Sequence, residues 1–267
     1  MLMKLHEVIA AVERLAPLRF QDEWDNSGLQ VGFPDAETGS VLVCLDVTEA
    51  VVEEAVAQQC SLIVSHHPLI FKALRQVSDA TYQQRCVVRA LAAGISVYSA
   101  HTSLDNAPGG VNHRIAEKLG LRDLRWLSPK ADGESGSGLV GELPEPLPAA
   151  DFLARVRSGF GVQCLRHSEP VAGREIRRVA LCGGAGAFLL SDAIRAGADC
   201  FVSGEFHYHD YFENRGVLLC ETGHYQSEQF TVELLQEHLR INCPGLRVVG
   251  TSLNTNPIRY ATRLPER

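Results

Sequence analysis

Short runs of apolar residues alternate with segments of helical periodicity along almost the whole chain, and this alternation constrains the fold more than any other feature. Strand-length apolar runs occupy residues 41–45, 62–65 and 95–100 of the first half. Segments with apolar residues at helical spacing lie around them, at residues 4–16, 48–58, 80–93 and 112–119. Such alternation is typical of α/β folds with parallel strands. The length of 267 residues allows two domains, each with its own core.

The second half of the chain repeats this order of apolar blocks, which indicates an internal duplication. Strands are predicted at residues 179–182, 200–203 and 217–220, and helices at residues 188–196 and 227–239. A shift of 138 residues aligns Val41 with Val179 and Ser65 with Ser203. Identity over that window is low, so the inference depends on the matching order of the blocks.

A segment rich in Gly, Pro, Ser and Glu separates the two halves at residues 128–150. We expect a linker there, with one short strand at residues 139–143. The division falls near Trp126. The chain is therefore predicted to form two topologically similar α/β domains, residues 1–126 and 127–267.

Imidazole and carboxylate side chains follow the predicted strands, at the sheet edge where ligands collect in α/β folds. The donors are His66 and His67 after the second strand, His101 and Asp105 after the third, and His224 and Glu228 after the last strand of the second half. A helix that begins near Tyr225 puts His224 and Glu228 on one face. Imidazoles and carboxylates hold divalent metals. We therefore expect a metal site, although each pair alone also fits a packing feature or a solvated helix face.

Two residues near these donors have two interpretations each. His101 either ligates a metal or orients Asp105, and we favour orientation. Glu205, which the shift of 138 residues aligns with His67, is either a general base beside the metals or part of a polar loop.

Two glycine-rich segments are candidates for phosphate-binding loops. Gly136–Gly141 matches G-x-G-x-x-G, but no strand is predicted before it and no helix after it, so it does not indicate a dinucleotide site. Gly183, Gly184 and Gly186 lie between a predicted strand and a predicted helix. Their backbone N–H groups either bind an anion or form a tight turn from strand to helix.

Composition disfavours several classes of protein. The net charge is −7, so the chain has no overall basic field for nucleic acid. No cysteine pair forms C-x-x-C, which argues against a thiolate zinc site. We expect Cys44, Cys182, Cys200 and Cys220 to be reduced thiols in the core. The N-terminus does not resemble a signal peptide, and no apolar stretch reaches the ~20 residues of a membrane helix. The expectation is a cytoplasmic protein without a membrane segment.

Five segments, taken in order, resemble the Nif-three-like family of dinuclear-metal proteins, whose members are often labelled GTP cyclohydrolase 1 type 2 homologues. The segments are Trp24–Gly32 (WDNSGLQVG), Ser65–Pro68 (SHHP), His101–Asp105 (HTSLD), Cys182–Gly186 (CGGAG) and Gly223–Glu228 (GHYQSE). The resemblance covers nearly the whole chain, and five motifs in order are far more specific than any one of them.

The resemblance implies two similar α/β domains with a pair of divalent metal ions in the cleft between them. By the matching motifs, His67 and Asp105 would hold one ion. His66 and His224 would hold the other, and Glu228 would bridge the two. Mixed nitrogen and oxygen ligation suits zinc, iron, manganese, cobalt or nickel. The resemblance also implies a toroidal homohexamer whose metal sites open toward an inner cavity, and it does not identify the substrate.

Three functions follow from these features. We favour a metal-dependent hydrolase similar to a type 2 GTP cyclohydrolase, which acts on a nucleotide or another phosphorylated molecule with water activated by the metal pair. The alternative is a non-catalytic scaffold whose ring encloses DNA or protein, although the acidic balance disfavours nucleic acid. The third is metal storage or delivery.

Overall fold

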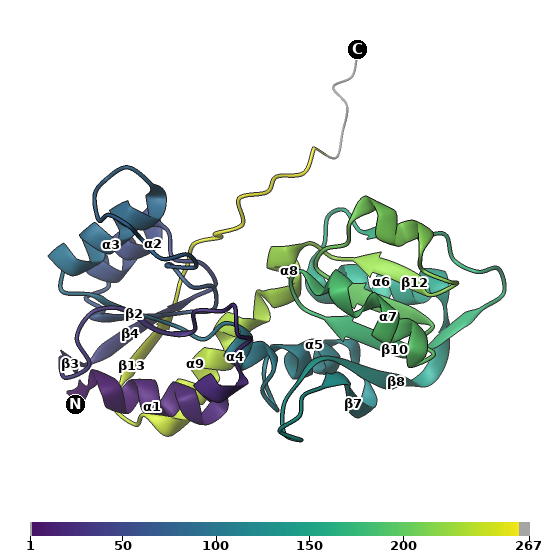
Figure 1. The fold of residues 1–267 in the computed structure, drawn as a ribbon, viewed down its shortest axis with the longest axis horizontal. Coiled ribbons are helices and arrows are strands. Elements are labelled where there is room, and N and C mark those ends of the chain that lie inside the picture. The colour runs from purple at the N-terminus through teal and green to yellow at the C-terminus, as the bar shows by residue number, and fades with distance from the viewer. Residues whose placement is uncertain (1, 262–267) are drawn as a thin grey trace, which may run out of the picture. The chain divides into compact units, whose positions relative to one another are not determined.

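The computed structural model describes residues 2–261, which fold into two compact units. The first unit contains the described chain up to Gly110 together with Thr231–Thr255. The second contains Val111–Phe230 and the described residues from Asn256 onward. Each unit has a sheet of five or six strands packed with helices (Figure 1). The fold is therefore mixed α/β with several sheets.

The sheet of the first unit has five strands in the order β13-β4-β5-β6-β2. The strands are β2 (Gly28–Val31), β4 (Ser40–Cys44), β5 (Leu62–Ser65), β6 (Ser96–Ser99) and β13 (Arg247–Gly250). β13, β4, β5 and β6 are parallel, and β2 pairs antiparallel with β6. Every residue of β4, β5 and β6 is buried, as expected for parallel strands covered on both faces. A separate antiparallel pair joins β1 (Met3–Lys4) to β3 (Glu37–Thr38).

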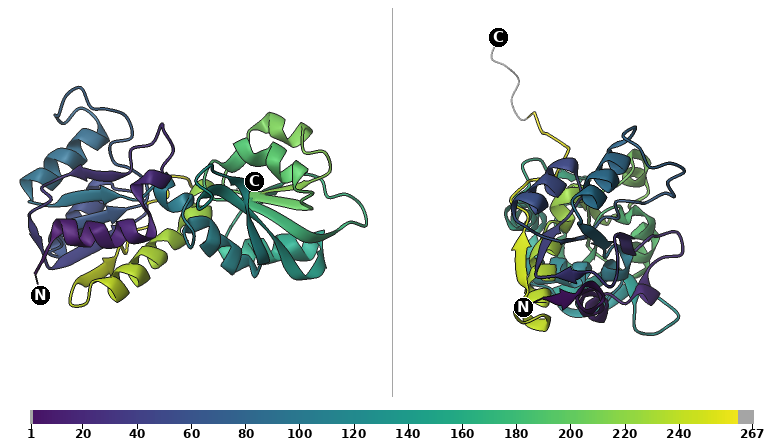
Figure 2. Two further views of the ribbon diagram at one scale, coloured as in Figure 1. Left: turned by 60° about the horizontal axis from the view of Figure 1, so that its bottom comes forward. Right: turned by 90° about the vertical axis from the view of Figure 1, so that its left-hand side faces the viewer.

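Helices lie on both faces of this sheet (Figures 1 and 2). They are α1 (Leu5–Leu15), α2 (Glu49–Ala57), α3 (Tyr82–Ala92), α4 (Thr102–Asp105) and α9 (Phe230–Asn242), with the short 3-10 helix η1 (Leu18–Phe20). α2 and α3 contribute Val51 and Val87 to one buried cluster. α1 and α9 lie side by side, and His238 Nε2 donates to Ala11 O at 2.7 Å. The side chain of Thr48 accepts the N–H of Val51 at 3.3 Å and so caps α2.

The sheet of the second unit has six strands in the order β7-β8-β10-β11-β12-β9. The strands are β7 (Arg122–Pro129), β8 (Gly136–Pro148), β9 (Arg166–His167), β10 (Glu175–Cys182), β11 (Cys200–Ser203) and β12 (Leu218–Glu221). β10, β11 and β12 are parallel. β8 is antiparallel to β7 and to β10, and β9 is antiparallel to β12.

The helices of the second unit pack against this sheet. They are α5 (Val111–Leu119), α6 (Ala149–Phe160), α7 (Leu190–Arg195) and α8 (His224–Glu228), with the 3-10 helices η2 (Gly186–Leu189) and η3 (Tyr208–Phe212). α5 and α6 contact β8 and β10. One buried cluster joins Leu189 and Ala193 to Phe201 of β11. The helix predicted at residues 188–196 therefore forms, but its first turn is the 3-10 helix η2.

The linker predicted at residues 128–150 does not form, whereas the strand predicted within it at residues 139–143 lies inside β8. These residues contain the end of β7, a turn and the 13-residue strand β8, which pairs with β7 on one side and β10 on the other. Pairing on both sides satisfies the backbone groups of β8, so its glycine and proline content does not break the strand. Packing also favours glycine at position 136, because a Cβ at Gly136 would lie 2.5 Å from the Trp126 ring.

The two units differ from the division at residue 126 that the duplication predicts. β7 belongs to the second unit because it pairs with β8. β13, near the end of the chain, belongs to the first unit because it extends the sheet beside β4. The apolar pattern of a strand does not identify the strand with which it pairs. The sequence therefore does not predict the units to which β7 and β13 belong.

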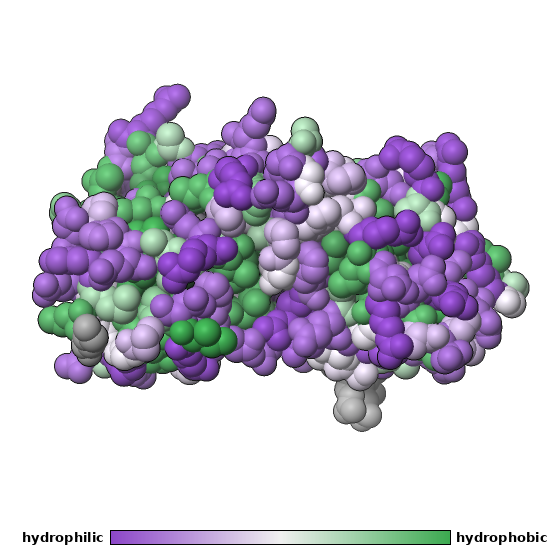
Figure 3. Space-filling view, turned by 90° about the horizontal axis from the view of Figure 1, so that it is seen from below, coloured by the Kyte–Doolittle hydropathy of each residue, from purple (hydrophilic) through white to green (hydrophobic). Residues whose placement is uncertain are grey.

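The surface is mixed in polarity on one face (Figure 3), and the cysteines are free thiols. On the face shown in Figure 3, hydrophilic residues interrupt the hydrophobic areas. All eight cysteines are free, and seven of them are buried, including the four predicted as core thiols. Among the helices of residues 2–261, none combines the length and the apolar character that a membrane crossing requires.

Candidate metal centre

In the first unit, the parallel pairing of β5 and β6 brings four predicted donors to one edge of the sheet. His66 and His67 follow β5, and His101 and Asp105 follow β6, whose end lies level with that of β5. The ring centroid of His66 lies 4.9 Å from that of His67 and 5.4 Å from that of His101. His66 Nε2 lies 3.6 Å from Asp105 Oδ1, and the His66 side chain is fully buried. The three imidazoles and the carboxylate form a compact group.

Each of the three imidazoles is held by a hydrogen bond at Nδ1. The acceptors are Ala100 O for His66 (2.9 Å), Asp46 Oδ1 for His67 (2.7 Å) and Asp25 Oδ1 for His101 (2.7 Å). A carbonyl or carboxylate acceptor places the proton on Nδ1 and the lone pair on Nε2. This is the tautomer in which a histidine binds metal through Nε2.

Asp46 orients His67, a role that the motifs do not single out. Its second oxygen accepts a hydrogen bond from Thr255 Oγ1 at 2.6 Å. Burial raises the pKa of Asp46, but the hydrogen bonds from His67 and Thr255 and the nearby imidazole charge outweigh burial and hold the pKa below its ordinary value. The carboxylate is therefore ionised at neutral pH. The sequence does carry a signal for it, since Asp46 comes soon after the apolar run 41–45, as the other donors follow theirs.

His101 Nδ1 pairs with Asp25, whereas the sequence favours a role for His101 in orienting Asp105. Asp25 Oδ2 also accepts the N–H and the hydroxyl of Thr102, at 3.0 and 2.6 Å, and the hydroxyl of Ser27 at 2.8 Å. Burial raises the pKa of Asp25, but the hydrogen bond and charge of His101 and these further bonds hold it well below its ordinary value. The hydrogen bond between His101 and Asp105 joins their backbones, because Asp105 N–H donates to His101 O at 3.1 Å.

In the second unit, α8 begins at His224 and ends at Glu228, so one helical turn places both side chains on the same face. His224 Nε2 lies 3.2 Å from Glu228 Oε2. Glu228 is only 3% exposed, which is unusual for a carboxylate without a special role. The turn into α8 requires Gly223, whose φ is +92° and where a Cβ would lie 2.4 Å from the Gln226 side chain.

The Glu205 carboxylate lies beside the His224 ring. Its Oε1 is 3.0 Å from His224 Nδ1. This is a third carboxylate–imidazole pair, arranged like the Asp46–His67 pair. The general-base interpretation of Glu205 predicts an oxygen directed at substrate, whereas the contact with Nδ1 favours a role in orienting His224.

The glycine-rich loop after β10 uses its N–H groups within the unit. Gly183 donates to Asn112 Oδ1 (3.0 Å), Gly184 to Ser227 Oγ (2.9 Å) and Gly186 to Ser203 Oγ (3.1 Å). The loop is therefore a tight turn, the second of the two interpretations, and these N–H groups are not directed at an anion. Gly184 also makes room for Glu228, because a Cβ at Gly184 (φ +60°) would lie 2.4 Å from Glu228 Oε1. The loop packs against the carboxylate and positions it.

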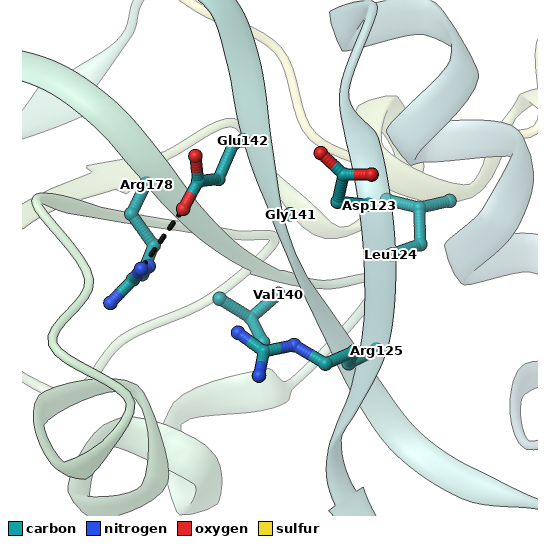
Figure 4. A pocket seen from close by; sticks show the side chains of 7 residues that line it. All are labelled: Asp123, Leu124, Arg125, Val140, Gly141, Glu142 and Arg178. Atoms are coloured by element: carbon teal, nitrogen blue, oxygen red, sulfur yellow. Dashed lines mark hydrogen bonds and ion pairs between the residues drawn. The ribbon is translucent and has the colours of Figure 1, made fainter.

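A hollow of about 280 Å³ in the second unit contains none of these donors (Figure 4). It is lined by Asp123, Leu124, Arg125, Val140, Gly141, Glu142 and Arg178. Arg178 Nη2 donates to Glu142 Oε1 at 2.9 Å, so two of its charged groups neutralise each other. None of the residues that line the hollow is a candidate metal ligand.

Comparison with known proteins identifies relatives over nearly the whole chain. The family described as Duf34/NIF3 (NGG1p interacting factor 3) matches residues 3–257. A Lactococcus lactis protein named "GTP cyclohydrolase 1 type 2 homolog" is 34% identical over 259 residues, which cover 96% of this chain and 98% of that protein. The crystal structure of Staphylococcus aureus hypothetical protein SA1388 has a TM-score of 0.89 at 27% identity and covers 97% of this chain and 99% of that one. The structure of a Bacillus cereus protein related to NIF3 has a TM-score of 0.90 at 22% identity, with the same coverage.

Proposed function

The chain belongs to the Duf34/NIF3 family, and on this premise we propose that it is a metal-dependent hydrolase whose two units together hold a pair of divalent metal ions. His66, His67 and Glu228 support the proposal, because each offers a nitrogen or oxygen atom suited to a metal. The observation that carries it is the anchoring of the imidazoles at Nδ1, which presents Nε2 of His66 and His67 as ligand atoms.

The donor set fits such a pair in its chemistry. Following the family resemblance, we assign His67 and Asp105 to one ion, His66 and His224 to the other, and Glu228 as the bridge. Imidazole and carboxylate donors suit zinc, iron, manganese, cobalt or nickel. Five protein ligands are too few to fill the coordination of two ions, which is typical of catalytic rather than structural sites.

The carboxylates behind the imidazoles keep the ligands in place. Asp46 holds His67, and Glu205 holds His224. Such partners fix the orientation of the ring and raise the basicity of the ligating nitrogen. A bound pair of divalent ions polarises a substrate oxygen and lowers the pKa of water.

His101 has a different task in this proposal. The Asp25 carboxylate fixes its Nδ1 proton, and its ring lies beside those of His66 and His67. Its Nε2 is thereby left to accept or donate a proton at the substrate. His101 replaces Glu205 as the candidate general base.

The proposed substrate is a nucleotide or a related phosphorylated molecule. The relatives named "GTP cyclohydrolase 1 type 2 homolog" suggest this class. Opening the ring of GTP requires attack of water on a purine carbon, a hydrolytic step that suits a metal pair.

We also propose that the two units derive from a duplication and that the metal site lies in the cleft between them. Support comes from the two parallel triads, β4-β5-β6 and β10-β11-β12, which have the same strand order. In each triad the third strand also pairs with an antiparallel neighbour, β2 or β9. A toroidal homohexamer is part of this proposal, and light scattering is expected to give the mass of six chains.

Metal analysis of matched variants tests the function. Protein purified anaerobically is expected to contain two divalent ions per chain and to hydrolyse one member of a panel of nucleotides and phosphoesters. His67→Ala and Glu228→Ala should lose both metal and turnover. His6→Ala, which removes a half-exposed imidazole paired with Asp35, is the matched control and should lose neither.

Two results would reject the hydrolase. The first is turnover that persists after the metal is removed. The second is a metal-loaded protein that has no turnover on the panel but binds DNA in a salt-dependent manner, which would favour the scaffold.

A further inference from the structure

Two large aromatic side chains, Trp24 and Phe71, are exposed beside the imidazoles of the first unit. Trp24 is 61% exposed and Phe71 is 47% exposed, so both leave apolar surface in water that folding usually removes. Their ring centroids lie 5.8 Å apart and their planes are inclined by 55°. Since the rings are tilted rather than stacked, neither covers the face of the other.

Hydrogen bonds join the two loops that carry these rings. Asn26 Nδ2 donates to Ile70 O at 2.6 Å, and Ile70 N–H donates to Gln30 Oε1 at 3.2 Å. Asn26 Nδ2 also lies 3.2 Å from Gln30 Oε1. Ile70 precedes Phe71, and Asn26 follows Trp24 by two residues. The aromatic pair is therefore a pre-organised surface rather than two independent loop tips.

His101 lies between the aromatic pair and the candidate metal ligands. Its ring centroid is 6.0 Å from that of Trp24 and 6.1 Å from that of Phe71, with nearly perpendicular planes. The same ring lies 5.4 Å from His66 and 5.7 Å from His67. A molecule placed against Trp24 and Phe71 therefore has one edge beside His101.

We propose that Trp24 and Phe71 position the substrate by stacking against a planar heteroaromatic ring of nucleobase size, with the reacting edge of that ring toward His101. The inference rests on the proposed hydrolase function and names its substrate class. Aromatic side chains accept any base, because every base has a π face.

A protein partner fits this surface less well than a small ring does. The charged and exposed residues Glu23 and Lys72 are the chain neighbours of Trp24 and Phe71. A stable protein interface needs about 800 Å² from each partner, far more than two partly exposed rings offer. The surface instead matches one planar ring system that packs against the exposed faces of Trp24 and Phe71.

Fluorescence of Trp24 gives a direct test, because the chain has only two tryptophans. In a Trp126→Phe background, Trp24 is the single reporter. Titration with guanosine monophosphate is expected to quench its emission, after correction for absorption by the nucleotide. Ribose 5-phosphate, which has no base, is expected to leave the emission unchanged.

Calorimetry on variants then tests the role of the ring. Trp24→Ala is expected to weaken binding of guanosine monophosphate about 10-fold or more, and Trp24→Phe to retain most of the affinity. Phe33→Ala is the matched control, because Phe33 is another exposed ring of the same unit, 71% exposed. It should leave binding unchanged, and unchanged circular dichroism should show that each variant is folded.

Elemental analysis of the same protein separates the two levels of the proposal. Bound metal without quenching, or equal losses in Trp24→Ala and Phe33→Ala, would overturn the stacking site and leave the metal proposal standing. Nucleotide binding that is lost in Trp24→Ala and kept in Phe33→Ala, in a protein that binds no metal, would support the stacking site and reject the hydrolase.

Discussion

Replacement of Asp46 tests whether the carboxylates behind the imidazoles control metal binding. Asp46 Oδ1 lies 2.7 Å from His67 Nδ1, and Oδ2 lies 2.6 Å from Thr255 Oγ1, so both oxygens are engaged. Asp46→Asn keeps the shape and one acceptor but removes the negative charge. Asp46→Ala removes the charge and the acceptor, so the two variants separate the effects.

The expected loss of affinity is graded. Hydrogen-bond partners of ligating histidines typically contribute 10- to 100-fold to metal affinity, which corresponds to about 1.4 to 2.8 kcal/mol. The Asp46 carboxylate is charged at neutral pH, because the bonds from His67 and Thr255 outweigh the effect of burial on its pKa. We therefore expect Asp46→Asn to weaken zinc binding about 10-fold and Asp46→Ala about 100-fold.

Competition with a chromophoric chelator measures these affinities. Asp35→Ala is the matched control, because Asp35 pairs with His6 at 3.5 Å but its side chain is 95% exposed and distant in the sequence from every proposed ligand. This variant should bind zinc as the wild type does. The reasoning is refuted if Asp46→Ala binds zinc as tightly as the wild type, or if Asp35→Ala loses as much affinity.

Two further predictions concern stability. Gly184→Ala places a Cβ 2.4 Å from Glu228 Oε1 and should lower the free energy of unfolding by roughly 1–3 kcal/mol more than Gly133→Ala, where φ is also positive but the space is open. Equal losses in denaturant titrations would contradict the proposed contact. Burial lowers the pKa of His113, so its folded form binds a proton less readily than its unfolded form. The stability due to neutral His113 is therefore present above about pH 6.5 and is lost as pH falls below it. His113→Gln should lose less stability than the wild type between about pH 7.5 and about pH 5. Parallel curves of unfolding free energy against pH for the two proteins would contradict this.

The strands were predictable because a buried parallel strand is apolar on both faces. The apolar runs 62–65 and 200–203 have the same bounds as β5 and β11. The failures arise where structure depends on a partner distant in the sequence. β8 is a long strand because β7 and β10 pair with it, and no local pattern in residues 128–150 contains that information.

The site shows the same division between local and distant information. His224 and Glu228 are one helical turn apart, so their contact follows from spacing alone. Asp25 and His101 are separated by 76 residues, and no spacing rule links a buried carboxylate to an imidazole across that distance. The donors themselves were predictable because parallel strands bring their carboxyl ends to one edge of the sheet.

Anomalous diffraction from crystals grown with manganese or zinc is the most direct test of the metal pair. We expect two anomalous peaks per chain, with His66 and His67 of the first unit and His224 and Glu228 of the second unit among the ligands. Maps with a single ion, or with ions bound only by donors of one unit, would contradict the proposal.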